Sequence, residues 1–293
     1  MTFDKARSTA YNRDKKQILT CVFGAEVMRM DEQKERYKEY IDRLCLMDDT
    51  FFNVCMDGYI AGMACILRII LALPELIVER VTVQETTETL YGRGVRFDAF
   101  VRAGKRRMNV EVQRDERGAQ PERARFNSSM MDARELQKGE VVKELPETYV
   151  IFIMEKDVFG KGLPIYHVRR MIEETGEPFG DRTHIIYVNG EIQDETPLGR
   201  LMHDFFCQDA ETMYYEELKQ RAGFFKNEER GRVQMCKIMD EIRQAGFEHG
   251  MERDRLESLR TIMQTMKLSE EEAMNALLIP LEKRAKYKAL LAQ

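Results

Sequence analysis

The spacing of hydrophobic residues changes along the chain, and each change predicts a different kind of element. Residues 33–46 have the pattern of a helix, and a second helix is expected to begin at "DDTFFNV" and to continue into the apolar stretch near residues 60–73. The segment "IVERVTVQETT" then alternates between apolar and polar positions, as a strand with one buried face does. The chain is therefore expected to begin with helices and to pass into a sheet.

Residues 95–113, "VRFDAFVRAGKRRMNVEVQ", predict a β-hairpin. Gly104-Lys105 is expected to form a two-residue turn, and glycine in its first position suits type II′. This register gives one apolar face on which three cross-strand pairs form, namely Phe97 with Val112, Ala99 with Val110 and Val101 with Met108. On the other face it places Asp98 opposite Glu111, with Gln113 two residues along.

The segments after the hairpin complete the pattern of an α/β fold. A helix is expected from Pro121 to Lys138, ending at Gly139. "TYVIFIM" is a continuous run of β-forming residues, which suits a strand buried on both faces, and "THIIYVNG" is a further strand. This order of elements indicates a mixed sheet with helices on its faces.

The character of the chain becomes helical and heavily charged from Glu195 onward. Ser269 and Glu272 have the spacing of a capping box, and a last helix is expected after Pro280. We expect three regions: a polar N-terminal segment over 1–30, a core over 31–210 and a helical C-terminal extension over 211–293. The extension is expected to mediate self-association and to take no part in chemistry.

Composition indicates a globular protein and bears on the cellular compartment in which it is expected. The chain has 293 residues, 43% of them apolar and 33% charged, with no tryptophan and 7 prolines, so it can bury a sizeable core. The six cysteines show no CxxC pair, which favours buried thiols in a reducing cytosol. The N-terminus carries charge where a signal peptide needs an apolar segment, and the longest apolar stretch contains Arg68, so a cytoplasmic protein without a membrane span is expected.

Charge is segregated along the chain. The whole chain has a net charge of -5, which disfavours indiscriminate coating of nucleic acid. The window from Arg93 to Arg125, however, carries ten lysines and arginines against five acids. This window holds the hairpin and predicts either a phosphate-binding surface or a solvated rim rich in arginine.

The two carboxylates of the hairpin need a compensating charge. Like charges placed opposite each other in a sheet repel, and burial pushes one of them toward its protonated form. A divalent ion such as Mg²⁺ or Mn²⁺ would relieve the repulsion of Asp98 and Glu111, because hard cations take carboxylate oxygens. An arginine would also do so, with three candidates nearby, namely Arg96, Arg114 and Arg125.

Several short motifs together resemble a known family. "RFDAF", "NVEVQ", "RARFNSSMMD" and "LPETYVIFIMEKD", with "DDTFFNV" before them and "TPLGRLMHDFF" after them, are similar to the Rpn-type recombination-promoting nuclease and transposase group of the PD-(D/E)XK nuclease superfamily. The resemblance covers about residues 48–210. It implies a restriction-endonuclease-like core that carries a metal-dependent phosphodiesterase site.

The resemblance also assigns the central residues. Asp98 matches the first acid of the motif and Glu111 the second, so both are expected to bind Mg²⁺ or Mn²⁺ and to be catalytic. Gln113 stands where many superfamily members have lysine; its amide can orient a water or a phosphate oxygen but cannot supply charge. Glu85, or an acid near Asp48, is a candidate for a further metal ligand.

The basic residues that follow are expected to meet the substrate. Arg125 is assigned to the catalytic group, where it would neutralise charge on phosphorus, and three residues are assigned to substrate binding, namely Arg123, Ser129 and Arg96. In the alternative interpretation Arg123 and Arg125 are exposed helix residues paired with Glu122 and Asp132.

Two functions from different classes fit these features. The first is a Mg²⁺-dependent DNA endonuclease linked to recombination or to mobile-element DNA. The second is a DNA-binding or protein-interaction module that keeps the fold and has lost cleavage. The trio Asp98, Glu111 and Gln113 favours the enzyme, and the acidic balance of the whole chain favours the module.

Overall fold

The computed structural model describes residues 35–87, 94–136 and 139–291. It divides the chain into two compact units, one through Arg232 and one over Val233–Gln293. The polar segment expected over residues 1–30 lies outside the described residues. The boundary expected near residue 210 stays a prediction.

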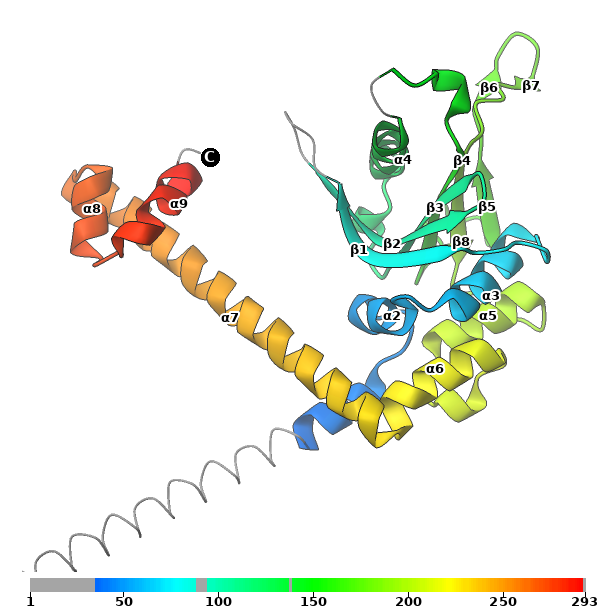
Figure 1. Ribbon diagram of the computed structural model, residues 1–293, viewed down its shortest axis with the longest axis horizontal. Helices are drawn as coiled ribbons and strands as arrows, with labels where there is room; N and C mark the ends of the chain where they lie inside the picture. Colours follow the sequence, from blue (N-terminus) through cyan, green and yellow to red (C-terminus); the bar gives the residue numbers. More distant parts are fainter. Residues whose placement is uncertain (1–34, 88–93, 137–138, 292–293) are drawn as a thin grey trace, which may run out of the picture. The chain divides into compact units, whose positions relative to one another are not determined.

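A six-stranded mixed sheet forms the centre of the first unit, in the order β1-β2-β3-β4-β8-β5 (Figure 1). Strands β1 to β3 are antiparallel, β3, β4 and β8 are parallel, and β5 is antiparallel to β8. The strands are β1 Arg80–Thr87, β2 Val95–Ala103, β3 Arg106–Gln113, β4 Glu147–Met154, β5 Ile165–Val168 and β8 Thr183–Asn189, and a separate ribbon pairs β6 Met171–Ile172 with β7 Glu177–Pro178. The predicted mixed α/β sheet is confirmed, and it is consistent with a restriction-endonuclease-like fold.

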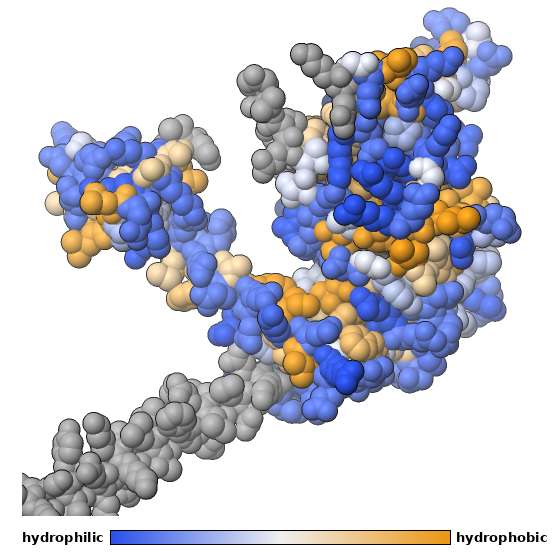
Figure 2. Space-filling model, viewed as in Figure 1, coloured by the Kyte–Doolittle hydropathy of each residue, from blue (hydrophilic) through white to orange (hydrophobic). Residues whose placement is uncertain are grey.

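Helices cover both faces of this sheet (Figure 1). Helix α4 Pro121–Glu135 joins β3 to β4 and packs on β4 and β2, while α2 Asp49–Met56 and α3 Ile60–Leu71 pack on the sheet from the opposite side. Helices α5 Pro197–Phe206 and α6 Glu216–Asn227 pack on α3. Hydrophobic side chains gather where the sheet meets α3 (Figure 2). Short 3-10 turns are found at η1 Glu116–Gly118, η2 Val142–Glu144 and η3 Ala210–Thr212.

The sequence explains the local structure of the central elements. Proline is favoured in the first turn of a helix, and Pro121 occupies that position in α4. Strand β4 has parallel neighbours on both sides and is buried from Thr148 to Met154, as its continuous apolar run predicted.

The expectation of one continuous helix from "DDTFFNV" into residues 60–73 is wrong. The chain leaves α2 at Asp57 and starts α3 at Ile60, with Gly58 between them in the left-handed conformation at φ 62°. Within the described residues no single helix is long and apolar enough to cross a membrane; α2 and α3 together reach that length and composition, but they are bent by 115° at their junction.

The predicted register of the hairpin is confirmed at its turn end and fails at its open end. Ala99 pairs with Val110 and Val101 with Met108, and Gly104 in the turn has φ 58°. The ladder between β2 and β3 starts at the Ala99 pair, so Asp98 does not pair directly with Glu111 as expected.

The cause lies in an irregularity of the strand at Asp98. On the neighbouring strand, Gln84 is left-handed at φ 52° and falls between the pairs that flank Asp98. The rings of Phe97 and Phe100 lie 5.6 Å apart in one apolar cluster, although residues three apart in a regular strand point to opposite faces. Strand β2 therefore turns away from β3 just where the first carboxylate is placed.

The second unit is helical, as predicted. It contains most of α7 Glu229–Met266, followed by α8 Glu270–Ala276 and α9 Leu281–Leu291. Ser269 and Glu272 form the predicted capping box. A small core holds this unit together, with Leu259, Ala273, Met274, Ile279 and Tyr287 as its buried members.

Candidate functional site

Asp98, Glu111 and Gln113 come together where β2 separates from β3. Asp98 Oδ2 accepts hydrogen bonds from the Val112 backbone N–H at 3.3 Å and from Gln113 Nε2 at 3.4 Å. Gln113 Nε2 also lies 3.4 Å from Glu111 Oε2. The amide thus bridges the two carboxylates, and the Asp98 side chain accepts the Val112 N–H just beyond the point where the β2–β3 ladder ends.

Glu111 is fully buried and is surrounded by donors. Its Oε1 accepts from Asn109 Nδ2 at 2.9 Å and from Asn127 Nδ2 at 3.2 Å. Its Oε2 accepts from Arg123 Nη2 at 2.9 Å, in addition to the longer contact from Gln113. Charged and amide donors are what a buried carboxylate requires.

The carboxylate pair is nevertheless undercompensated. Burial first, then the charges of Glu111 and Asp49, raise the pKa of Asp98 to about 8. Burial also raises the pKa of Glu111, and the opposing effects of Asn109 and Arg123 do not cancel it. Without a cation the pair therefore holds a proton near neutral pH.

The acids considered as a further metal ligand have different partners in the structure. Asp48 is engaged elsewhere, because it accepts from the Cys45 backbone N–H at 2.8 Å and pairs with Arg114 at 3.0 Å. Glu85 forms an ion pair with Arg134. Asp49, at the start of α2, is the acid on this side whose charge acts on Asp98.

The residues present fit a hard divalent cation. The two carboxylates supply oxygen ligands, and the buried carbonyl oxygens of Asn109 and Asn127 beside them have no hydrogen-bond partner. Across residues 35–87, 94–136 and 139–291 there is no group of three or more His, Cys, Asp or Glu side chains placed to hold a metal. A pair of carboxylates suits Mg²⁺ or Mn²⁺, which keep several waters when bound to proteins.

Gln113 is held in its orientation by a glycine in η1. A Cβ atom on Gly118 would lie 1.8 Å from Gln113 Oε1, so the amide oxygen packs directly against that glycine. The amide nitrogen is thereby left to face Asp98 and Glu111.

Three residues of the site were not predicted from sequence: Asn109, Asn127 and Gly118. Asn109 is two residues before Glu111 on the same strand, and Asn127 is one helical turn after Arg123. These spacings place both asparagines on the faces that carry the site, so the sequence pattern could have identified them. No local pattern marks Gly118, because its role depends on the fold bringing η1 against the end of β3.

The basic residues predicted to meet the substrate lie in different surroundings. Arg123 reaches Glu111, so it does not form the pair with Glu122 considered in the alternative interpretation. Arg125 and Ser129 are exposed, and the Ser129 hydroxyl donates to the Arg125 backbone carbonyl at 3.0 Å. Arg96 is exposed at the start of β2. The roles of Arg125, Ser129 and Arg96 stay predictions.

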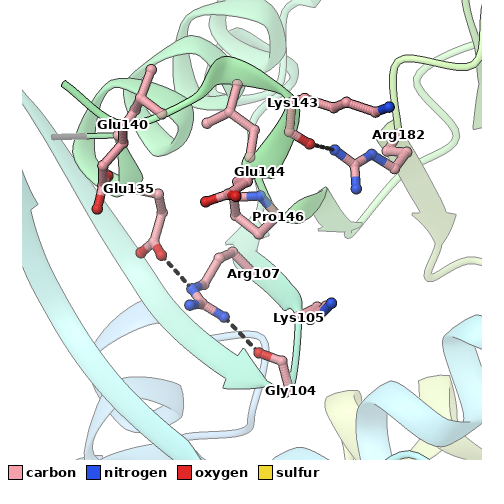
Figure 3. A pocket seen from close by; sticks show the side chains of 11 residues that line it. Gly104, Lys105, Arg107, Glu135, Glu140, Lys143, Glu144, Pro146 and Arg182 are labelled. Carbon is pink, nitrogen blue, oxygen red and sulfur yellow. Dashed lines mark hydrogen bonds and ion pairs between the residues drawn. The ribbon is translucent and has the colours of Figure 1, made fainter. Parts of the chain in front are cut away.

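A hollow of about 630 Å³ lies at the turn end of the hairpin (Figure 3). Its charges are largely used within the protein: Arg107 donates to Glu135 at 2.7 Å and to the Gly104 carbonyl at 2.9 Å, and Arg182 donates to the Lys143 carbonyl at 2.9 Å. Both acids and bases line it (Figure 3). It belongs to the opposite end of β3 from Glu111 and is separate from the carboxylate site.

Comparison with known proteins identifies the region that carries the site. No curated protein and no solved structure matches the chain. The family model described as PD-(D/E)XK nuclease family transposase matches residues 72–195, which include all strands of the sheet, helix α4 and the trio Asp98, Glu111 and Gln113. The family expected from the sequence motifs is confirmed over residues 72–195, where the sheet region matches the model of the PD-(D/E)XK nuclease family transposases.

Proposed function

We propose that this protein is a divalent-metal-dependent DNA endonuclease. The observation that carries the proposal is the carboxylate pair of half-buried Asp98 and fully buried Glu111, bridged by Gln113 within the nuclease-family region. An acid pair whose charge is only partly compensated is costly to the fold, and a cation site at which phosphate chemistry takes place gives a reason for it.

In this proposal each side chain has a distinct task. Asp98 and Glu111 hold Mg²⁺ or Mn²⁺, which when bound would activate a water for attack on phosphorus. Gln113 orients that water or a phosphate oxygen through its amide. Arg123, already beside Glu111, supplies positive charge close to the phosphate, and Arg125 supplies it from the exposed side of α4.

The remaining parts of the proposal concern the setting of the reaction. The substrate is DNA undergoing recombination or belonging to mobile elements, with Arg96 and Ser129 contacting its backbone. The protein acts in the cytoplasm and self-associates through its C-terminal helices.

One observation favours the alternative, a module that binds DNA without cutting it. Arg123 pairs with Glu111 at 2.9 Å and so provides some of the positive charge that a metal would provide. In that case the arginine is the permanent partner of the second carboxylate and no cation is needed.

A plasmid assay decides between the two functions. Supercoiled DNA is incubated with the full-length protein in Mg²⁺, Mn²⁺, Ca²⁺ or EDTA. The proposal expects nicked or linear product with Mg²⁺ or Mn²⁺ and none with EDTA. Supercoiled substrate that persists in every metal would support the binding module.

The contact between Gly118 and Gln113 yields a prediction about rate. Gly118→Ala is expected to displace the Gln113 amide and to slow cleavage by roughly 10² to 10³ fold, as expected when one transition-state hydrogen-bond donor is lost. Gln113→Ala should give the same loss, and the two substitutions together should cost no more than either alone. Mn²⁺ affinity should stay unchanged in both variants.

Gly223→Ala is the matched control for this substitution. A Cβ atom there meets its nearest neighbour at 3.8 Å, which is an ordinary contact. Single-turnover rates of the three single variants and of the double variant provide the comparison. A Gly118→Ala protein that cleaves as fast as the Gly223→Ala protein would show that the orientation of Gln113 is unimportant.

The helical unit yields a prediction about mass. Helix α7 exposes several large apolar side chains, namely Val233, Ile242, Phe247 and Met251. Truncation after Arg232 is expected to lower the number of chains per particle, measured as mass by light scattering, while metal binding at Asp98 and Glu111 persists. A full-length protein that is already monomeric would contradict this expectation.

A further inference from the structure

A hollow of about 660 Å³ lies directly beside the carboxylate site. Arg123 and Asn127 belong to its wall, and both side chains also donate to Glu111. The start of β2 and the first turns of α4 form the rest of it. A group bound there would therefore be adjacent to whatever occupies the carboxylates.

The lining of this hollow does not suit a lone phosphate. Phe126 is 37% exposed and presents an aromatic surface, and Glu122 adds a negative charge. Arg96 and Arg117 stand at the rim as exposed cations, and Arg117 is paired with Asp115 at 2.5 Å. An aromatic surface flanked by cations suits a nucleobase whose neighbouring phosphates lie outside.

Glu122 adds a polar group to the lining of the hollow, and its side chain is exposed. The amino or imino groups of a base are donors of the kind this carboxylate would take.

We propose that this hollow holds one unstacked base of the substrate strand, next to the phosphate at Asp98 and Glu111. This inference rests on the proposed nuclease function and adds a substrate class to it: single-stranded or locally unpaired DNA is preferred over continuous duplex. A base in a duplex is stacked and paired, and it must leave the helix to enter a pocket of this kind.

Binding measurements with the full-length protein test the preference. A fluorescein-labelled single strand and a hairpin duplex of the same sequence are titrated in Ca²⁺ and followed by anisotropy. The single strand is expected to bind more tightly, and Phe126→Ala should weaken its binding about fivefold to a hundredfold, the range for loss of one base-stacking contact. Phe126→Tyr keeps the aromatic surface and should bind like the wild type.

Phe179→Ala is the matched control, because Phe179 is 60% exposed and lies just after β7, outside the hollow. It should leave both affinities unchanged. Equal affinity of the wild type for the two DNAs, or a Phe126→Ala protein that binds the single strand as the wild type does, would overturn the inference.

Cleavage in Mg²⁺ separates this inference from the proposed function. Cleavage of both DNAs with no effect of Phe126→Ala would remove the base site and keep the nuclease. Tight single-strand binding that depends on Phe126, without cleavage in any metal, would keep the base site and remove the nuclease.

Discussion

Glu111→Gln is expected to reduce DNA cleavage to background while the protein stays folded. The substitution keeps the size of the side chain and the acceptor oxygen that Asn109 and Asn127 contact, but it removes the charge needed to hold a cation. The loss should exceed the roughly 10² to 10³ fold expected for Gln113, which only orients a reacting group. Single-turnover cleavage with excess protein gives the measurement.

Glu135→Gln is the matched control for this experiment. Glu135 is also largely buried, with 9% side-chain exposure, and it pairs with Arg102 and Arg107 on the same unit. It lies at the far end of α4 from the carboxylate site. Cleavage should survive its neutralisation. If Glu111→Gln cleaves at the wild-type rate, the hairpin is not the active site.

Asp98→Asn is expected to stabilise the metal-free protein, and increasingly so as the pH rises. The pKa of Asp98 is about 8 in the folded protein, against 3.8 for an ordinary aspartate. Between these values the folded state holds a proton that the unfolded state has lost, so the free energy of unfolding of the wild type falls as pH rises through this window. The asparagine variant lacks this dependence.

Thermal melting across that pH range, in EDTA, measures the effect. The melting temperature of the variant should be no lower than that of the wild type at any pH, and the difference should widen up to about pH 8. Mn²⁺ should then raise the melting temperature of the wild type more than that of the variant. A large loss of stability in Asp98→Asn would instead indicate that the carboxylate has a structural role paired with arginine.

Much of the fold follows from local patterns in the sequence. Strand β4 is a continuous apolar run and was predicted almost to the residue, and the hairpin turn at Gly104-Lys105 follows from turn chemistry. The break between α2 and α3 was missed although Asp57-Gly58 is a dipeptide that marks turns, because apolar residues dominate the segments before and after it. Strand β5 is only four residues long and leaves little pattern.

The candidate site was predicted in its central residues and missed in its surroundings. Glu111 and Gln113 are two residues apart on β3, so the alternation of side chains along a strand predicts that they share one face. The irregularity at Asp98 has no local signal, because it depends on Gln84 of the adjacent strand. The partners Asn127 and Gly118 come from α4 and η1, and only the packed fold brings these against β3.

The charge environment was also only partly accessible from sequence. The excess of arginines around the hairpin is evident, but which arginine reaches a carboxylate depends on helix phase. Arg123 and Asn127 are one turn apart and face the sheet, while Arg125 lies between them and is exposed. Neighbouring arginines in one motif thus have different surroundings.

Calorimetric titration with Mn²⁺ is the most direct test of the central claim that Asp98 and Glu111 form a metal site. The wild type is expected to bind Mn²⁺ and to release protons as it does so, because the pair holds a proton near neutral pH. The proton competes with the cation, so affinity should rise with pH and level off above about pH 8. Asp98→Asn and Glu111→Gln should each weaken binding. Unchanged affinity in both variants, or no binding by the wild type at any pH, would contradict the account.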